Sequence, residues 1–293
     1  MIGVVVLNWN ELEQTTACLE SLLDAEPGPA RVVVVDNGSA DGSADALERW
    51  LAIRGDPRLA LLRSPQNRGF AGGVNLGLAQ LARDAAVSHF LLLNNDATVE
   101  RTFFAELHRA MTRIPGAAIV GPTIYRSDRR DTVWYAGGRL PGLRGVAVHH
   151  HELPPGDDPV PTEFVSGCAL LVSRSAWERL GPVPECYFIY FEDAEYCRRA
   201  RDAGLRVLYA PRAVAHHAVA GTMGRDGARP AAAYRFTRAQ ALYLRRNLTG
   251  WLRIGALLYF AVTRPARAAI EAVHGRVGVA WGLLRGAARG LVA

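Results

Sequence analysis

Four short segments of the chain combine oxygen-bearing side chains with glycines or acidic residues, the residue types that bind nucleotides, hold metal ions or move protons. They are DNGSADGS at residues 36–43, NRGFAGGVNLG at 67–77, NND at 94–96 and YFEDAEYCRR at 190–199. A carboxylate at the tip of a buried strand, such as Asp36, can accept hydrogen bonds from a nucleobase or a ribose. Taken alone, the 36–43 segment is more typical of an Asx turn that caps a helix without any ligand.

The segments at 67–77 and 94–96 are suited to phosphate chemistry. Glycines after a strand let the backbone approach a ligand closely, and the helix N-terminus that follows favours anions. The 67–77 segment lacks the G-x-G-x-x-G spacing of a dinucleotide fingerprint. Asp96 ends an apolar run beside Asn94 and Asn95, and one such carboxylate can hold Mg²⁺ or Mn²⁺ on a diphosphate. A plain turn is the alternative for these three residues.

The acidic segment at 190–199 predicts one catalytic base. Adjacent residues of a helix point about 100° apart, so Glu192 and Asp193 are not expected to face the same site. The alternative role for Asp193 is to complement the helix dipole from the first turn. Glu195 is expected to pair with Arg199 one helical turn later.

Alternating apolar runs and helical periods predict an α/β framework that positions these segments. Short β-branched or leucine-rich runs at residues 2–7, 31–36, 59–63 and 89–93 are each followed by an amphipathic stretch, beginning near residues 11, 43, 71 and 100. Such runs are typical of parallel strands that are buried on both faces of a sheet. Ligands of open parallel sheets bind beyond the carboxyl ends of the strands, so the residues after these runs are expected to form one site.

From about residue 124 to residue 161 the chain has no regular period and is rich in Gly, Pro, Arg and His. We interpret it as an irregular insertion or a flap on the acceptor side, with short strand-like pieces at 132–136 and 145–149. The three histidines at 149–151 are expected to lie in solvent. Regular structure is expected to return at 163–172, followed by helices from about 175 and over 192–203 and by a strand at 206–209.

Together and in this order, the four segments resemble glycosyltransferase family 2, and most closely its rhamnosyltransferase-like members. The resemblance also includes VVVLNWN at residues 4–10 and VSGCALLVSR at 165–174, and it covers about residues 2–247. It implies the GT-A fold, a mostly parallel central sheet flanked by helices. It further implies an inverting enzyme that moves a sugar from a nucleoside-diphosphate donor to a glycan or lipid-linked acceptor in cell-surface polysaccharide synthesis.

The resemblance also implies roles for particular residues. Asp193 becomes the general base, Asp36 contacts the base or ribose of the nucleotide, and Asp96 ligates Mg²⁺ or Mn²⁺. A histidine that contacts the metal or the diphosphate is implied soon after the base; we favour His216, and His217 remains the alternative. Further contacts to the nucleotide sugar are expected from Asn8, Asn10, Asn37, Asn67, Gly69, Gly73, Asn75, Asn95 and Glu192.

Asn94 departs from the family pattern, because it stands where the usual D-x-D motif has its first carboxylate. The charge of the metal is then less balanced by protein, which argues against tight metal binding before the donor arrives. One alternative function is a sugar nucleotidyltransferase, which would need a glycine-rich loop with a basic residue where this chain has NWN at 8–10. Another is a non-catalytic nucleotide-sugar-binding protein, which the intact acidic pair at 192–193 disfavours.

The C-terminal part of the chain is basic and apolar, since residues 234–293 contain ten arginines and one acidic residue, Glu271. This confinement of the basic excess to an apolar tail disfavours nucleic-acid binding.

We predict a catalytic domain at residues 1–233, with a nucleotide-sugar half at about 1–122 and an acceptor half at about 123–233. Residues 234–293 are predicted to form an amphipathic helical extension, whose uncharged run at 254–263 is shorter than the ~20 residues of a membrane-spanning helix.

The extension has two candidate partners. Arginines and aromatic residues on an apolar helix suit the surface of an anionic membrane leaflet. Packing on the catalytic domain, or on a second copy in a homodimer, is the alternative.

The N-terminus shows no signal peptide, and the four cysteines are too far apart for a paired metal motif. We therefore expect a cytoplasmic protein. If the extension binds lipid, the protein is expected to be peripheral on the inner face of the cell membrane.

Overall fold

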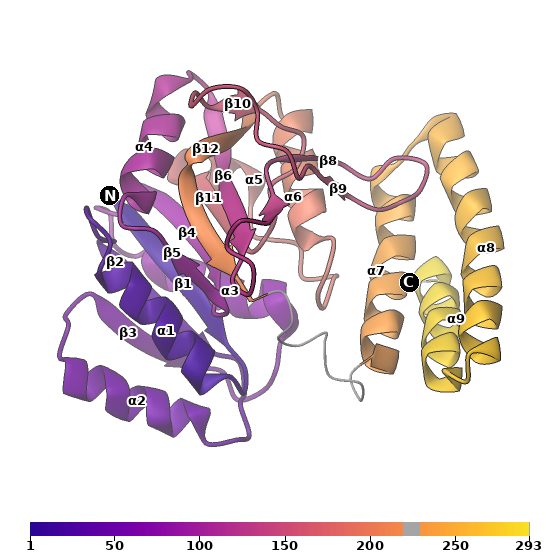
Figure 1. Cartoon of the computed structure of the whole chain (residues 1–293), viewed down its shortest axis with the longest axis horizontal. Helices are drawn as coiled ribbons and strands as arrows, with labels where there is room; N and C mark the ends of the chain where they lie inside the picture. The colour runs from indigo at the N-terminus through magenta and orange to yellow at the C-terminus, as the bar shows by residue number, and fades with distance from the viewer. Residues whose placement is uncertain (219–228, 293) are drawn as a thin grey trace.

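The computed structural model describes residues 1–218 and 229–292, and strands alternate with helices through its first half (Figure 1). The elements up to residue 113 are β1 (Ile2–Asn8), α1 (Leu12–Leu23), β2 (Arg31–Asp36), α2 (Ser43–Arg54), β3 (Leu59–Arg63), α3 (Gly69–Leu81), β4 (His89–Asn94), β5 (Ala97–Val99) and α4 (Phe103–Arg113). The next elements are β6 (Ala117–Arg126), β7 (Val133–Tyr135), β8 (Gly138–Arg139), β9 (Val148–His149), β10 (Val160–Pro161), β11 (Ala169–Ser173), α5 (Arg174–Leu180), α6 (Glu192–Asp202) and β12 (Arg206–His217). The helices α7 (Arg229–Asn247), α8 (Gly250–Val273) and α9 (Val277–Val292) follow.

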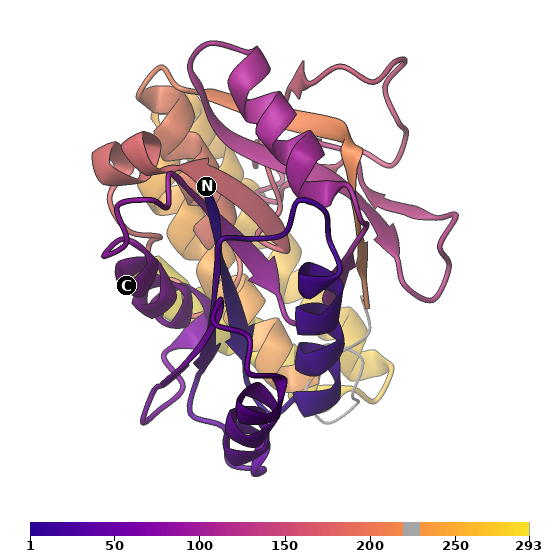
Figure 2. The same cartoon turned by 90° about the vertical axis from the view of Figure 1, so that its left-hand side faces the viewer.

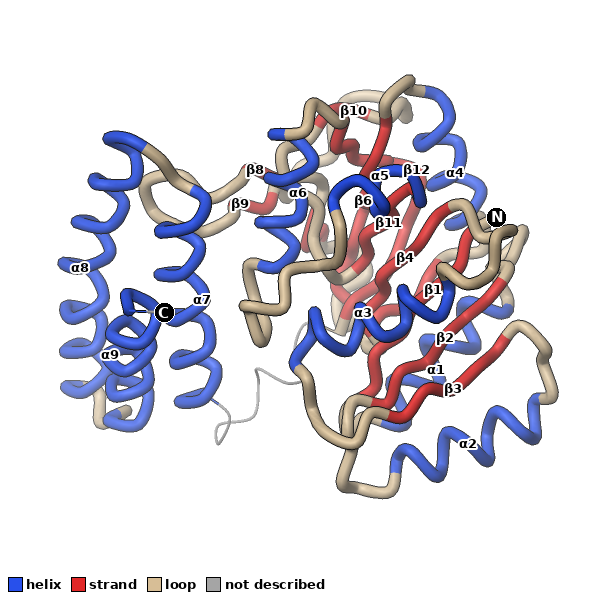
Figure 3. Tube along the Cα trace, turned by 180° about the vertical axis from the view of Figure 1, so that it is seen from behind, coloured by secondary structure: helices blue, strands red, loops and turns tan. Residues whose placement is uncertain are grey.

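Apolar strands form a central sheet in the order β10-β12-β6-β11-β4-β1-β2-β3, to which β5 and β7 are attached. Strand β1 pairs in parallel with β2 and β4, and β2 pairs in parallel with β3. Helix α3 covers one face of the sheet, while α1 and α4 cover the other (Figures 1 and 3). Because both faces are covered, the strand residues are apolar on both sides. The predicted α/β class is confirmed.

Strand β11 runs antiparallel to β4 and to β6. Its first residues therefore lie beside the last residues of β4, where the Asn94 N–H donates to the Cys168 carbonyl over 2.9 Å. This reversal brings residues 166–168, which precede β11, to the edge of the sheet at which β1, β2 and β4 end.

Strand β6 is not predicted by the sequence, which indicates irregular chain from residue 124. The pair Gly121-Pro122 interrupts its apolar pattern. The glycine is required by packing, because a Cβ at Gly121 would lie 2.5 Å from Val165 Cγ1. The strand is therefore shaped by a neighbour that is distant in the sequence.

Strand β12 is much longer than the predicted strand at 206–209. It pairs in parallel with β6 as far as His217, with a register shift between Ala210 and Val214. The shift absorbs Pro211 and Arg212, which break the apolar pattern in the sequence. The additional length carries His216 and His217 to the ligand-binding edge of the sheet.

Helices α7, α8 and α9 form a separate layer, to the right of the sheet in Figure 1 and behind it in Figure 2. Glycines spaced four residues apart let α9 lie directly against the backbone of α7. A Cβ would lie 2.4 Å from the Pro230 carbonyl oxygen at Gly282, and 2.5 Å from the Tyr234 carbonyl oxygen at Gly286. The predicted boundary after residue 233 falls inside α7. Within the described ranges, no helix is long and apolar enough to cross a membrane.

Gly286→Leu is expected to destabilise the contact between α7 and α9. The new side chain would collide with the α7 backbone, and overpacking of this kind costs about 1–3 kcal/mol, more than the roughly 1 kcal/mol that a helix gains when glycine is replaced. Thermal unfolding should therefore begin at a lower temperature. Ala288→Leu, at an exposed position of the same helix, is the control, and equal stability of the two variants would contradict the close packing.

Candidate active site

A cavity of about 550 Å³ lies at the carboxyl edge of the sheet. Its walls come from the ends of β4 and β12, the residues before β11, the start of α6, the flap at 134–149 and the start of α7. The lining side chains that could do chemistry include Asn94, Asp96, Cys168, Glu192, Asp193 and His217. The acidic segment and the NND segment, almost 100 residues apart in the sequence, therefore meet in one cavity.

Asn8 and Asp36 are register partners at the ends of β1 and β2. Asn8 Nδ2 donates to Asp36 Oδ1 over 2.8 Å, and the Ser39 hydroxyl donates to the same oxygen over 2.6 Å. The Ser39 N–H donates to the other carboxylate oxygen over 3.1 Å. Asn8 and Asp36 are buried, so Asn8 supports a carboxylate that three donors hold in one orientation.

Asn95 and Asn10 extend this network to neighbouring strands and turns. Asn95 Nδ2 donates to Thr15 Oγ1 over 2.9 Å, and Thr15 Oγ1 lies 2.9 Å from Asn8 Oδ1. Asn10 has a φ of 58° and accepts the Ala40 N–H over 2.9 Å. The ends of β1, β2 and β4 are thus joined by hydrogen bonds among residues expected near the nucleotide.

The glycine-rich segment at 67–77 seats α3 on the sheet. Gly69 has a φ of +74°, and a Cβ there would lie 2.2 Å from the Phe188 carbonyl oxygen, so only glycine fits. A Cβ at Gly73 would lie 2.3 Å from a side chain of β1. Asn37 donates to the Gly69 carbonyl over 3.0 Å, and Asn67 accepts the Gly69 N–H over 2.8 Å. These residues build the turn, and none of them lines the cavity.

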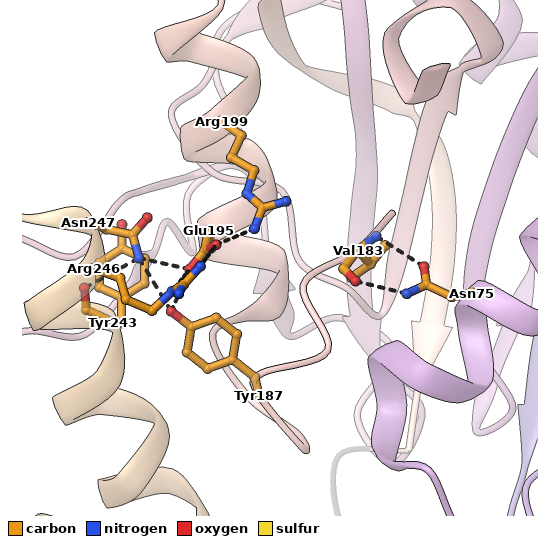
Figure 4. Close-up of polar contacts among 8 residues, drawn as sticks. All are labelled: Asn75, Val183, Tyr187, Glu195, Arg199, Tyr243, Arg246 and Asn247. Atoms are coloured by element: carbon orange, nitrogen blue, oxygen red, sulfur yellow. Dashed lines mark hydrogen bonds and ion pairs between the residues drawn. The ribbon is translucent and has the colours of Figure 1, made fainter. Parts of the chain in front are cut away.

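Asn75 does not join the site. Its amide donates to the Val183 carbonyl over 2.8 Å and accepts the Val183 N–H over 3.0 Å (Figure 4). A further hydrogen bond of 2.9 Å reaches Glu185 Oε1. The side chain thus fastens α3 to the segment between α5 and α6. Asn75, which was expected to contact the nucleotide sugar, does not line the cavity.

Asp96 and His217 face each other in the cavity, with 3.1 Å between Asp96 Oδ1 and His217 Nε2. Asp96 Oδ1 is buried, and apart from this contact it has no partner among the described residues; His217 Nδ1 is likewise buried without a partner there. Burial alone would lower the pKa of His217, but the adjacent Cys168 and Asp96 outweigh it and raise the pKa well above its usual range. A carboxylate that faces an imidazole is suited to a divalent cation, which would take the place of the imidazole proton.

The structure places only one of the two histidines, His217, at the cavity. His216 Nε2 lies 2.9 Å from Glu100 Oε1, and its ring stacks on Tyr125 at 5.9 Å. Successive residues of a strand point to opposite faces, so only one of the pair can face the cavity, and it is His217. Within residues 1–218 and 229–292, no group of three or more His, Cys, Asp or Glu side chains is arranged around a common metal position.

Glu192 and Asp193 both line the cavity, contrary to the prediction that only one of them would. They are the first two residues of α6, and the preceding Phe191 has a φ of 70°, so the helix presents its N-terminal end to the cavity. The Asp193 carboxylate accepts the Gly167 and Ala194 N–H groups, each over 2.8 Å. The segment before the reversed strand β11 thus supplies, through Gly167, a donor that positions Asp193.

The two carboxyl groups differ in their electrostatics. Burial, together with the adjacent Asp193, raises the pKa of Glu192 well above its usual range, and Glu192 Oε2 has no hydrogen-bond partner in the described part of the chain. Burial also raises the pKa of Asp193, but the Gly167 and Ala194 N–H groups oppose the rise. When two carboxyl groups lie close together, ionisation of one disfavours ionisation of the other, so one has the lower pKa. Asp193 is therefore the carboxylate of the pair, and Glu192 is the one that keeps a proton.

Glu195 pairs with Arg199 over 2.5 Å, which confirms that prediction, and it has further partners that the sequence does not indicate (Figure 4). It accepts hydrogen bonds from Tyr187 over 2.7 Å, from Arg246 over 3.1 Å and from Asn247 over 3.0 Å. Burial would raise the pKa of Glu195, but these hydrogen bonds outweigh it and lower the pKa to about 2. A charged carboxylate therefore ties α6, which carries Asp193, to the end of α7.

The flap at 134–149 covers one side of the cavity. The ring of Trp134 lies 4.7 Å from those of His149 and His217, with edge-to-face geometry. His149 lines the cavity and is partly buried, and burial lowers its pKa to about 4. The expectation that all three histidines at 149–151 lie in solvent is therefore wrong for His149.

Known proteins with similar sequences include sugar transferases. A family model described as "Glycosyltransferase like family 2" matches residues 1–248. An N-acetylglucosaminyl-diphospho-decaprenol L-rhamnosyltransferase from Mycobacterium tuberculosis is 30% identical over 86% of this chain and 87% of its own length. A hexosyltransferase of low-salt glycan biosynthesis from Haloferax volcanii is 25% identical over 70% of this chain and 63% of its own length.

The fold is also found among solved structures. A mannosyltransferase from Pyrobaculum calidifontis, determined with GDP-Man and Mn²⁺, superposes with a TM-score of 0.62 at 19% identity and covers 99% of this chain and 86% of its own. The GT-A architecture expected from the sequence is confirmed by this likeness. The match over residues 1–248, the relative at 30% identity and the arrangement of strands around the acidic cavity agree, and the chain belongs to glycosyltransferase-like family 2.

Proposed function

We propose that this enzyme transfers a sugar with inversion from a nucleoside-diphosphate donor to a hydroxyl of a lipid-linked or glycan acceptor, with Asp193 as the general base. The observation that carries the proposal is the placement of Asp193. Two backbone N–H groups orient its carboxylate in the same cavity that contains Asp96 and His217. A raised pKa brings a carboxylate closer to the range in which it can accept a proton at neutral pH.

The donor is proposed to lie along the edge formed by the ends of β1, β2 and β4. Asp36 is the group for the base or ribose, and the network of Asn8, Asn10 and Asn95 supports it. Four residues act indirectly in this proposal, because they shape the turn beside Asp36. They are Asn37, Asn67, Gly69 and Gly73. Glu192, which keeps its proton, can donate a hydrogen bond to the bound sugar or to the diphosphate.

A divalent cation, Mg²⁺ or Mn²⁺, is proposed to be held by Asp96 and His217. The Asp96 carboxylate and the facing His217 ring fit such an ion, which would take the place of the contact between Asp96 Oδ1 and His217 Nε2, and diphosphate oxygens and water would complete its coordination. When bound, the cation neutralises negative charge on the departing nucleoside diphosphate. Asn94 supplies no charge, so the donor itself has to contribute to binding of the cation.

The reaction is proposed to be a single displacement. Asp193 accepts the proton of the acceptor hydroxyl, and the hydroxyl oxygen forms a bond to the anomeric carbon. The bond between that carbon and the diphosphate oxygen breaks at the same time, and the electron pair leaves with the nucleoside diphosphate. Attack from the face opposite the leaving group inverts the anomeric configuration, and no covalent intermediate forms on the protein.

The class of acceptor is inferred from the relative that is 30% identical, whose name states a lipid-linked diphosphate acceptor. The apolar side of the cavity, which includes Trp134, Phe236 and Trp9, suits an acceptor with apolar parts. Nucleotide release from a panel of sugar donors with Mg²⁺ or Mn²⁺, followed by screening of acceptors, tests the function. Binding of a donor without turnover under every condition would favour the non-catalytic alternative.

The rate of transfer is expected to fall on the acid side of a pH profile. The base acts when deprotonated, so kcat/KM is full above the pKa of Asp193 and falls as the pH drops through that pKa, which burial raises above its ordinary value. The pH profile of kcat/KM measures this limb, with donor binding followed over the same range as the control. An acid limb at the ordinary pKa of an aspartate, about 4, would contradict a buried base.

A further inference from the structure

Helix α8 exposes its apolar face. Trp251, Leu258, Val262 and Val273, which recur at helical spacing, point into solvent, with exposures of 86% for Trp251 and 70% for Val262. We call these four residues the outer face of α8. An ordinary surface helix buries its apolar stripe and exposes its polar side. An exposed apolar stripe of this kind indicates a binding surface.

The side of α8 that faces α7 and α9 is the less apolar one. It contains Ala256, Phe260 and Ala268, and also the buried Glu271. Arg276 donates to Glu271 over 2.5 Å, and Arg267 lies 3.8 Å from it. The helix therefore turns its acidic group inward, where it is paired, and most of its large apolar side chains outward, where nothing in the described part of the chain covers the outer face.

The charge around the outer face has one sign. Residues 229–292 contain eleven arginines and a single acidic residue, Glu271. Arg267 and Arg276 pair with Glu271, and Arg246 pairs with Glu195 of α6. Arg253 lies near the start of α8, is exposed, and has no acidic partner among the described residues. The surface thus combines apolar side chains with uncompensated positive charge.

We propose that the outer face of α8 docks on an anionic lipid surface. Apolar side chains enter the boundary between headgroups and acyl chains, and the arginines contact anionic headgroups. A second copy of this chain fits the surface less well. A twofold contact would bring the exposed Arg253 of both copies to one interface, where the described residues offer it no acidic partner.

The docked surface is connected to the cavity, an argument that rests on the proposed lipid-linked acceptor. Leu143, at the tip of the flap, is exposed and reaches α8, where a Cβ at Gly255 would lie 3.2 Å from Leu143 Cδ1. Farther along the flap, Val146 and Ala147 line the cavity. The flap therefore extends from the proposed lipid surface to the cavity that contains Asp193, along a path suited to an acceptor whose lipid stays in the membrane.

Co-sedimentation of the full chain with vesicles tests the proposal. Vesicles of phosphatidylcholine with phosphatidylglycerol should bind the protein, vesicles of phosphatidylcholine alone should bind it on the order of tenfold less, and added salt should weaken the binding. The double variant Leu258→Glu, Val262→Glu should reduce binding to the anionic vesicles on the order of tenfold or more. Ile53→Glu, at an exposed apolar position of α2, is the matched control and should bind like the original protein.

Other outcomes would overturn the proposal. Equal binding to both kinds of vesicle would exclude recognition of anionic lipid, and a double variant that binds vesicles normally would exclude the outer face. A second copy would be identified as the partner if the full chain does not bind vesicles and is a dimer in solution, and if the double variant is a monomer. Donor turnover on a short soluble acceptor should be the same in the double variant and in Ile53→Glu. Because turnover needs no lipid, its failure would count against the proposed function and not against docking.

Discussion

Asp193→Asn is expected to slow sugar transfer by about 100- to 10,000-fold, the usual contribution of a general base, while leaving the affinity for the donor nearly unchanged. The amide cannot accept the proton of the acceptor hydroxyl, and it has one acceptor oxygen for the two N–H groups that the carboxylate now satisfies. The Ala194 or the Gly167 N–H would lose its partner, at about 1–3 kcal/mol of stability. Steady-state transfer rates, donor affinity by calorimetry and thermal unfolding together separate the chemical effect from the structural one.

Two variants in the same helix serve as controls. Glu192→Gln should be milder, because Glu192 keeps its proton and the amide can still donate a hydrogen bond. Asp202→Asn, at an exposed position at the end of α6 where the carboxylate pairs with Arg198, should be neutral. Near-normal turnover in Asp193→Asn combined with a severe loss in Glu192→Gln would reverse the assignment within the pair.

The N-terminal half of the fold could be predicted from the sequence because its signal is local. The runs at 31–36 and 59–63 coincide with β2 and β3, since each is a short apolar run bounded by turn residues. Strand β6 could not be found in this way, because Gly121-Pro122 interrupts it and only contact with Val165 explains the glycine. A local pattern cannot contain a constraint that a distant segment imposes.

The candidate site was predictable in composition but not in detail. The four segments contain Asp36, Asp96 and Asp193, because carboxylates at strand and helix ends are a local signal. The structure places Asp96 and Asp193 in one cavity, which Asp36 does not line. The histidine could not be chosen by counting, since the register shift between Ala210 and Val214 changes which later residues of β12 share a face. From the sequence, Glu192 and Asp193 were both expected to contact substrate but not to face one site, because the angle of about 100° between adjacent helical residues leaves out that a helix end can present its first turn to a cavity.

The direction in which the apolar side of α8 points could not be predicted from the spacing of its apolar residues. The spacing of apolar residues in α8 predicts an amphipathic helix, yet it does not say whether the apolar side packs inward or faces out. The structure answers this through α9, whose glycines at 278, 282, 286 and 290 bring it against α7 without large side chains. That spacing of four was visible in the sequence and is the signal that could have predicted the helix pair. With α7 and α9 packed through small residues, the large apolar side chains of α8 remain outside.

His217→Ala and Asp96→Ala are expected to lower kcat/KM by about a hundredfold or more, whereas His216→Ala should have little effect. Asp96 and His217 lie 3.1 Å apart in the cavity and are the proposed ligands of the cation, whose loss would remove several kcal/mol of stabilisation from the departing diphosphate. His216 faces Glu100 on the opposite side of β12 and contacts Tyr125. The measurements are kcat/KM, donor affinity with and without Mn²⁺, and the metal concentration that gives half-maximal rate.

The two histidine variants can be compared directly, because both replace a histidine by alanine at neighbouring positions of β12. Chelation by EDTA should abolish transfer by the original protein, and added Mn²⁺ or Mg²⁺ should restore it. His217→Ala should need more metal than the original protein, while the metal requirement of His216→Ala should be unchanged. Full activity in EDTA would show that the diphosphate is neutralised by protein groups alone, and a metal requirement shifted in His216→Ala but not in His217→Ala would mean that β12 presents the other face to the donor.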